Sequence, residues 1–135
     1  METCIFCKII REEIPCHKIY EDKDSLAFLD IKPHALGHTV VIPKNHVETV
    51  FELSEWEAQE LMIDVITVMN RIKTVLAPDG FNVGWNHHPA GGQVVPHLHF
   101  HIFPRYEGDG GGSMHSIIKS PGEKSVTEIA ALFQK

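Results

Sequence analysis

Residues 97–103 read HLHFHIF, and the three histidines of this run alternate with large apolar side chains. Successive side chains of a strand point to opposite faces, so we expect Leu98, Phe100 and Ile102 to enter a core. The three imidazoles then share the other face, which we expect to line a cavity or to meet solvent. Because imidazole can act as a nucleophile, a proton carrier or a metal ligand near neutral pH, the run predicts a strand that carries a reaction centre.

Four other runs of β-prone residues accompany this segment. Residues 18–21 and 25–30 flank a short charged turn and predict a hairpin. Residues 37–43 contain a β-branched run that ends at a proline, and they predict a third strand in the centre of the sheet. Residues 81–85 predict a fourth strand, and residues 98–103 form the fifth.

One long helix is predicted between the third and the fourth strand. Ser54 and Glu57 form a capping-box pattern, and apolar residues recur at helical spacing from Leu61 to Leu76. Pro78 then ends the pattern. Together these elements predict an α+β fold with a five-stranded, mainly antiparallel sheet, one long helix and short terminal helices.

The length of 135 residues suits a single domain, residues 1–135. Near the C-terminus, the glycine-rich residues 108–113 predict a flexible loop, and a variable tail follows at residues 114–135, with a short helix at 125–133. A net charge of −6 without a basic run argues against a nucleic-acid partner. The N-terminal residues lack a basic region followed by a long apolar stretch, so we expect a cytoplasmic protein without a membrane segment.

The residues alone leave three interpretations of the histidine run. His97 and His99 could bind a catalytic zinc ion with one further protein ligand and an open position. Alternatively, His99 could be a nucleophile whose second ring nitrogen is held by a backbone carbonyl, while a neighbouring imidazole donates to developing negative charge. The third possibility is a stacked histidine face without a chemical role.

Four blocks of the sequence resemble the histidine triad (HIT) superfamily of nucleotide hydrolases and transferases. They are CIFCKI at residues 4–9, LAFLDI at 26–31, GHTVVIPKNH at 37–46 and GQVVPHLHFHIFPR at 92–105. The resemblance implies a HIT-like fold and a homodimer in which the long helices and central strands meet across a two-fold axis.

The resemblance also implies the catalytic roles. His99 would attack the α-phosphorus of an adenine nucleotide derivative, leaving a nucleotidyl-histidine that water then cleaves. His101 would hydrogen-bond the phosphoryl oxygens, and Gln93 would hold the phosphate or the leaving group. His38 would lie near the active site, and the amide of Asn86 would touch the phosphate region.

The purine nucleotide would be held by residues of the first two blocks. Asp30 would accept hydrogen bonds from the ribose hydroxyls. Ile5, Phe6, Ile9 and Phe28 would sandwich the base. Each has an ordinary alternative, because Asp30 could be a turn residue and the apolar side chains could belong to the core.

Cys4 and Cys7 have a spacing that is typical of metal or redox sites. In bacterial-type members of the superfamily with zinc, these thiols are joined by two histidines, which here are His46 and His97. Two thiolates and two imidazoles would complete a closed, structural zinc site. Magnesium could neutralise a polyphosphate leaving group, although no carboxylate cluster indicates where it would bind.

Two positions bear on the substrate class. Val94 stands where phosphoramidate-cleaving relatives commonly have a serine, and Pro104 is reminiscent of the branch that cleaves dinucleoside polyphosphates. The substrates expected are therefore dinucleoside polyphosphates or nucleoside phosphoramidates. Two other functions remain open: a nucleotide-binding regulatory or scaffolding module with little turnover, and a zinc-dependent hydrolase.

Overall fold

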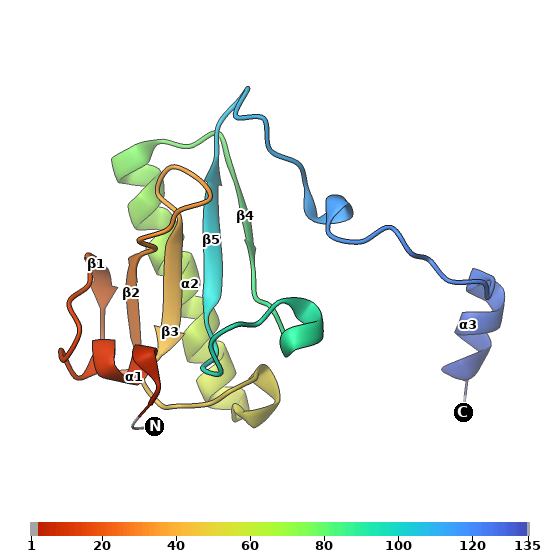
Figure 1. Cartoon of the computed structure of the whole chain (residues 1–135), viewed down its shortest axis with the longest axis horizontal. Coiled ribbons are helices and arrows are strands. Elements are labelled where there is room, and N and C mark those ends of the chain that lie inside the picture. The colour runs from red at the N-terminus through yellow and green to blue at the C-terminus, as the bar shows by residue number, and fades with distance from the viewer. Residues whose placement is uncertain (1–2, 135) are drawn as a thin grey trace.

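The computed structural model describes residues 3–134. Its sheet contains five antiparallel strands in the order β1-β2-β3-β5-β4 (Figure 1). The strands are β1 (Lys18–Glu21), β2 (Ser25–Leu29), β3 (Thr39–Pro43), β4 (Gly80–Gly84) and β5 (Phe100–Arg105). The helices are α1 (Ile5–Ile10), α2 (Glu55–Leu76) and α3 (Val126–Leu132), with short 3-10 turns η1 (Val50–Glu52), η2 (Pro89–Gly91) and η3 (Met114–Ser116). The predicted α+β fold with a central third strand is confirmed.

Apolar layers cover both faces of the sheet, because buried side chains of the central strands alternate between the faces. Val41 and Ile102 pack against α2 on one face. Val40 belongs to a second cluster on the opposite face, together with Ile9 from α1. Since Val40 is the partner of His101 in the β3–β5 register, the histidine row lies on the face that α1 covers.

The long helix α2 begins and ends as the sequence predicts. Ser54 and Glu57 exchange side-chain and backbone hydrogen bonds in a capping box, and Ala77 ends the helix in the left-handed conformation. Gly37 lies close to the end of the helix, where an added Cβ would be 2.4 Å from Cδ1 of Leu76. Among residues 3–134, no helix is both long enough and apolar enough to cross a membrane.

The fifth strand begins two residues later than predicted, at Phe100. His97 and Leu98 precede it in irregular backbone, although the N–H of Leu98 still donates to the carbonyl of Val47 (2.7 Å). The alternation of faces continues through this segment, so Leu98 is buried in the α2-side core as predicted. Beyond Ile102 only β4 pairs with β5, which allows a proline within the strand.

Residues 107–134, which we call the C-terminal arm, leave the body of the molecule and end in α3 (Figure 1). A short helix near residues 125–133 is thus confirmed, and Ser125 begins it with a capping box. The glycine-rich start of the arm contacts β5, because Arg105 forms a two-point ion pair with Asp109 and donates to the carbonyl of Gly112.

Candidate active site

The three histidines of the run differ in their exposure. His97 is completely buried, His99 retains 9% exposure and His101 is half-buried. The expectation that the whole row lines a cavity or meets solvent is therefore wrong for His97. His97 is buried because Cys4 and Cys7, at the start of α1, cover this end of the histidine row. Residues 97–103 alone cannot predict this, because the covering residues lie far away in the sequence.

The backbone determines which nitrogen of His97 can bind a ligand. Its Nε2–H donates to the carbonyl of Pro43 (2.9 Å), because a carbonyl oxygen can only accept. The lone pair of the neutral ring is then on Nδ1, which lies 3.4 Å from Sγ of Cys4, 3.7 Å from Sγ of Cys7 and 3.1 Å from Nδ1 of His46. Burial lowers the pKa of His97 to about 4, which keeps the ring neutral at pH 7.

These four side chains bring their ligand atoms close enough together to hold one metal ion. Their ligand atoms all lie within 4.8 Å of one another, and Sγ of Cys7 lies 3.2 Å from Nδ1 of His46. Ordinary zinc bond lengths place neighbouring ligand atoms roughly 3.3–3.8 Å apart in a tetrahedron. Burial raises the pKa of the Cys7 thiol, so a cation would be needed to hold it as a thiolate. The residues present fit a closed zinc site.

The local structure of α1 prepares this cluster. Cys4 is the N-cap, and its sulfur accepts a hydrogen bond from the backbone N–H of Cys7 (3.3 Å). One turn of helix therefore places both sulfurs on the same side. His46 arrives from the segment after β3, which ends at Pro43.

His99 is oriented differently from His97. Its Nδ1 lies 2.7 Å from the carbonyl oxygen of His97 and must donate its proton there, so the lone pair of the neutral ring is on Nε2. The edge of Phe6 packs against the ring, with 4.9 Å between centroids. Burial lowers the pKa of His99, which favours the neutral ring. His99 therefore has an unprotonated nitrogen in a fixed direction.

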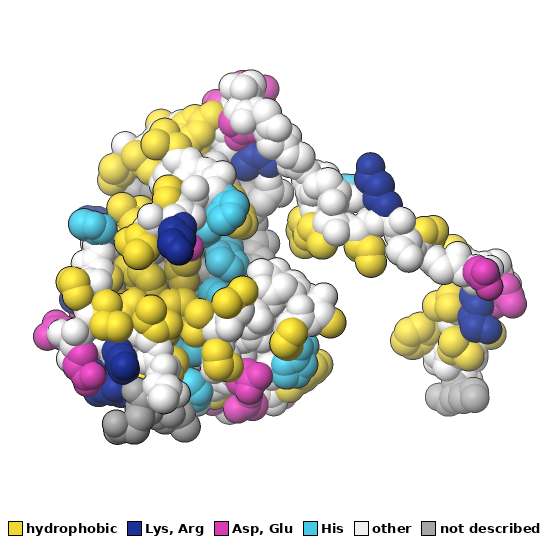
Figure 2. All heavy atoms as spheres, in the orientation of Figure 1, with side chains coloured by type: hydrophobic (Ala, Val, Ile, Leu, Met, Phe, Trp, Pro, Cys, Tyr) yellow, Lys and Arg dark blue, Asp and Glu magenta, His cyan; other side chains and the backbone are white. Residues whose placement is uncertain are grey.

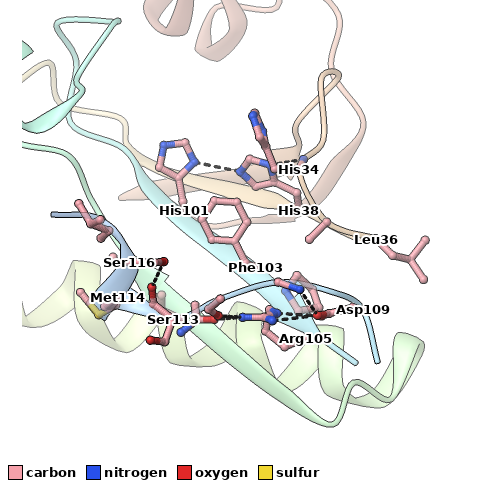
Figure 3. A pocket seen from close by; sticks show the side chains of 18 of the residues that line it. His34, Leu36, His38, His101, Phe103, Arg105, Asp109, Ser113, Met114 and Ser116 are labelled. Atoms are coloured by element: carbon pink, nitrogen blue, oxygen red, sulfur yellow. Dashed lines mark hydrogen bonds and ion pairs between the residues drawn. The ribbon is translucent and has the colours of Figure 1, made fainter. Parts of the chain in front are cut away.

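Asp30, His38 and His101 form a polar group beside His99, in which the two histidines are hydrogen-bonded to each other. The backbone N–H of His34 donates to Nδ1 of His38 (3.2 Å), so the proton of neutral His38 is on Nε2. That Nε2–H donates to Nδ1 of His101 (2.9 Å), and the proton of neutral His101 is then on its own Nε2 (Figure 3). Burial lowers the pKa of His38 and lowers that of His101 to about 4.

This group is less suited to a metal ion than the cysteine cluster. Its ligand atoms also lie within 4.8 Å of one another, and Oδ2 of Asp30 is 3.7 Å from Nε2 of His38. Coordination through Nε2 would move the His38 proton to Nδ1, where it would face the N–H of His34. Within residues 3–134, these two clusters are the ones that could hold an ion, and neither offers the several oxygen ligands that magnesium prefers. The structure therefore does not support the expected binding of magnesium.

A cavity of about 680 Å³ opens next to this group (Figure 3). Strands β4 and β5, the segment before β3 and the first part of the C-terminal arm provide its walls. His99 does not line it, but its ring lies 5.0 Å from that of His101. Site residues predicted from the sequence that do line it are Asp30, His38, Asn86 and His101.

None of the four residues expected to hold the base lines this cavity. Phe28 and Ile9 are buried in the α1-side cluster, where Phe6 packs edge-on against Phe28 at 5.8 Å, and Ile5 is half-exposed. Their role in base binding stays a prediction, since core packing accounts for Phe28 and Ile9. Asp30 forms the turn that the ordinary alternative expects, because its Oδ1 accepts the N–H of Lys32, while its Oδ2 lies 3.7 Å from Nε2 of His38. Contact of Asp30 with a ribose stays a prediction.

Gln93 uses its side-chain amide to hold the loop before the histidine row. Its Oε1 accepts the N–H of His88 (2.8 Å), and its Nε2 donates to the carbonyls of Glu48 (2.9 Å) and Val95 (3.1 Å). His88 has a positive φ of 59°, a strained conformation that these contacts stabilise. The amide hydrogens are thus engaged with backbone, and contact of Gln93 with phosphate stays a prediction.

Three contributors to the site are not predicted by the sequence patterns. His34 orients His38 through its backbone N–H, which no side-chain pattern could indicate. Arg105 and Asp109 join the start of the C-terminal arm to β5, and their i, i+4 spacing was the available signal. Residues 113–117 of the arm supply a wall of the cavity, with Ser113, Met114, Ser116 and Ile117.

Comparison with known proteins identifies one domain. The HIT domain matches residues 11–108. The chain is 46% identical to Protein hit of Bacillus subtilis over 114 residues, which cover 84% of this chain and 79% of that protein. It is 42% identical to an adenosine 5'-monophosphoramidase of Schizosaccharomyces pombe over 103 residues, covering 76% and 74%. A crystal structure of a HIT family protein from Bacillus anthracis is 41% identical, with a TM-score of 0.83, and the match covers 97% of this chain and 92% of that one.

Proposed function

This chain belongs to the HIT domain family, and we propose that within it the protein is a nucleotide hydrolase or nucleotidyl transferase that uses His99 as a covalent nucleophile. The observation that carries the proposal is the 2.7 Å hydrogen bond from Nδ1 of His99 to the carbonyl of His97. It leaves Nε2 with a lone pair in a fixed direction, as a nucleophilic imidazole requires.

In the first chemical step, Nε2 of His99 forms a bond to the α-phosphorus of the nucleotide. The bond from phosphorus to the leaving group breaks, and the amine or polyphosphate departs with the electron pair; an amine also takes up a proton from solvent. Water then attacks the same phosphorus, the bond to Nε2 breaks, and a nucleoside monophosphate leaves. If another nucleophile replaces water, the result is nucleotidyl transfer.

His101 would stabilise charge on the phosphoryl oxygens. Its proton on Nε2 is available because Nδ1 already accepts a hydrogen bond from His38. A donor that is oriented before the substrate arrives stabilises the transition state without reorganisation. Asp30 and Asn86 line the adjoining cavity and would contact the ribose and the phosphate region.

Zinc would be held by Cys4, Cys7, His46 and His97 as a structural ion. Four protein ligands leave no open position for a catalytic water. His99 is not a member of this cluster, and its Nδ1–H donates a hydrogen bond to the carbonyl of His97. These contacts support a histidine nucleophile over a zinc-dependent hydrolase.

The substrate class is an adenine nucleotide linked through its α-phosphate to an amine or to a polyphosphate. The monophosphoramidase from Schizosaccharomyces pombe supports the first linkage. Val94, where phosphoramidate-cleaving relatives commonly have serine, is 89% exposed and offers no hydroxyl proton to a leaving amine, which supports the second. We further propose a cytoplasmic homodimer in which α2 pairs across a two-fold axis, supported by the half-exposed Met62, Ile63 and Ile66 on that helix.

The test is to trap the covalent intermediate. Protein is mixed with adenosine phosphoramidate or a diadenosine polyphosphate that carries labelled α-phosphorus, quenched in alkali and digested. We expect label on the peptide that contains His99. His99→Ala should lose at least ~10³-fold in kcat while its affinity for adenosine monophosphate changes little, because the nucleophile is removed and the cavity is not.

His17→Ala is the matched control, since this exposed histidine lies outside the site and its loss should leave both label and turnover unchanged. His99→Gln provides a second variant if alanine leaves a destabilising hole beside Phe6. Turnover by wild-type protein without label at His99, or an unaltered rate in both His99 variants, would refute the nucleophile. Binding of adenosine monophosphate without turnover of either probe would indicate a binding module.

A further inference from the structure

Every residue of the C-terminal arm along its described length, 107–134, is exposed, and only the side chain of Asp109, which pairs with Arg105, is known to be partly covered, at 28% exposure. Figure 2 shows it standing away from the body, with hydrophobic side chains on the side that faces the body. Its strongly exposed apolar residues are Met114, Ile117, Ile118, Val126, Ile129, Leu132 and Phe133. A segment with this composition is expected to be covered by another surface.

The helix at the end of the arm cannot be explained by its own stability. Isolated helices shorter than about 12–15 residues are marginal in water, and α3 has only 7 residues. Its sequence nevertheless encodes a helix, since Ser125 and Glu128 form a capping box. Val126, Ile129 and Phe133 recur at helical spacing and share one face. An apolar surface contacting this face would supply the missing stabilisation.

The exposed area of the chain is too large for a compact monomer. Its accessible surface is 9371 Å². A folded monomer of 15.2 kDa is expected to expose roughly 7,100 Å². The excess of roughly 2,300 Å² matches what one chain buries in an obligate dimer, on the order of 1,000–2,500 Å².

The chemistry of the arm favours a protein surface as its partner. Residues 107–134 contain two lysines, Lys119 and Lys124, and four acidic residues, Glu107, Asp109, Glu123 and Glu128, so the arm offers no net positive charge to a nucleic acid or an anionic membrane. Outside α2, the body of the same chain also exposes apolar side chains, including Ile31, Leu36, Phe51 and Val94.

We propose that the C-terminal arm docks on the body of a second copy of this chain, and that the two copies exchange arms. Each copy would then supply one arm and one receiving surface, which is the self-complementarity that two-fold symmetry requires. All but the first two residues of the arm lie beyond the HIT domain, which ends at Gly108, yet the match to the Bacillus anthracis structure covers 97% of the chain. The match to that protein therefore extends into the arm, although the arm follows the HIT domain in the sequence.

Arm exchange would also complete the candidate active site. Ser113, Met114 and Ile117 at the base of the arm line the same cavity as His38 and His101. Docking of α3 on the second copy would hold residues 113–117 in place, so the cavity would keep this wall only in the dimer. This consequence rests on the proposed function, whereas the docking itself does not.

The test uses full-length protein with a photo-crosslinking amino acid in place of Phe133. Protein of natural isotope content (light) is mixed with isotopically labelled protein (heavy), and the mixture is unfolded, refolded and irradiated. Mass spectrometry then distinguishes crosslinks between two copies from crosslinks within one chain. We expect light–heavy adducts of twice the chain mass that map to the body. Adducts within one chain, or a dimer without arm adducts, would overturn the exchange.

A matched pair of variants tests the face of α3 by sedimentation. Ile129→Asp places a charge on the apolar face and should weaken dimerisation at least about 10-fold. Thr127→Asp adds the same charge off this face and should leave the dimer unchanged. Equal dimerisation of both variants, or a monomeric wild type, would refute docking on a second copy.

The link between docking and the candidate active site is tested by ligand affinity. The affinity for adenosine monophosphate should fall at least about 3-fold in Ile129→Asp but not in Thr127→Asp. An unchanged affinity in Ile129→Asp would refute only this link.

Discussion

At the scale of single residues, the backbone gives three neighbouring histidines three different chemical capacities. The carbonyl of Pro43 takes the Nε2 proton of His97 and leaves Nδ1 for a metal ion. The carbonyl of His97 takes the Nδ1 proton of His99 and leaves Nε2 for phosphorus. The N–H of His34 reaches His101 through His38, which leaves a proton on Nε2 of His101. Identical side chains thus acquire roles from their fixed tautomers.

Asp22 and Asp64 form a buried pair of carboxyl groups outside the site, and their interaction affects how stability depends on pH. Asp64 on α2 is buried beside Asp22, and its Oδ2 has no hydrogen-bond partner. Burial and the neighbouring Asp22 raise the pKa of Asp64 to about 6. Burial opposes ionisation of Asp22 as well, but hydrogen bonds from Asp64, Tyr20 and two backbone N–H groups lower its pKa.

Asp64→Asn should stabilise the protein more at pH 7.5 than at pH 4.5. The folded state binds the Asp64 proton more tightly than the unfolded state, so the wild type loses free energy of unfolding as the pH rises from about 4 to about 6. The variant lacks this loss and should gain roughly 1–3 kcal/mol at pH 7.5. Urea unfolding at both pH values measures the difference. Glu60→Gln, which removes a carboxylate from the same helix outside the pair, is the matched control. An equal effect of Asp64→Asn at both pH values would contradict the assignment.

At the scale of elements, α1 depends on its contacts for stability. It has only 6 residues, which is too short for an independent helix. It is held to the sheet by Ile9 in the core and by the cluster of Cys4 and Cys7 with His46 and His97. A metal ion in that cluster would therefore stabilise the contact between the first element and the histidine row.

Wild-type protein should contain about one zinc ion per chain, because the cluster provides one closed set of four ligands. Cys7→Ser should lose the metal and lower the melting temperature by roughly 5–10 °C. Elemental analysis and calorimetry measure both effects. Cys16→Ser is the matched control, since this thiol lies outside the cluster and its removal should keep the zinc. Zinc-free wild type purified without chelators would contradict this assignment.

At the scale of the whole molecule, a compact body carries an arm that contacts the body near its start and stands away from it beyond, with every residue exposed (Figure 2). The body holds both apolar layers and the histidine row, while the base of the arm forms one wall of the cavity. Stability, site and assembly should therefore be linked through the arm.

The melting temperature of the wild type should rise with protein concentration, by about 2–3 °C for each tenfold increase, because unfolding of a dimer releases two chains. Calorimetry across a hundredfold range of concentration measures this dependence. Ile129→Asp should melt at a lower temperature than the wild type at equal concentration, whereas Thr127→Asp should follow the wild type. A melting temperature independent of concentration would show that the chain unfolds as a monomer.

Much of the fold follows from local patterns in the sequence. The alternation in residues 97–103 correctly predicts Leu98, Phe100 and Ile102 in the core, because the period of a strand is a property of its backbone. The capping box of Ser54 and Glu57 marks the start of α2 for a similar reason, since both partners lie within one helical turn.

The tertiary structure decided what depends on residues distant in sequence. The burial of His97 requires Cys4, Cys7 and His46 to meet it, and the tautomer of His101 depends on a backbone N–H that lies 67 positions earlier, at His34. The cavity likewise forms where the C-terminal arm passes β5. Sequence by itself determined the elements and their apolar faces, since these arise from neighbours along the chain. Only the folded chain determined which nitrogen of each histidine is free, since that depends on contacts between segments brought together in space.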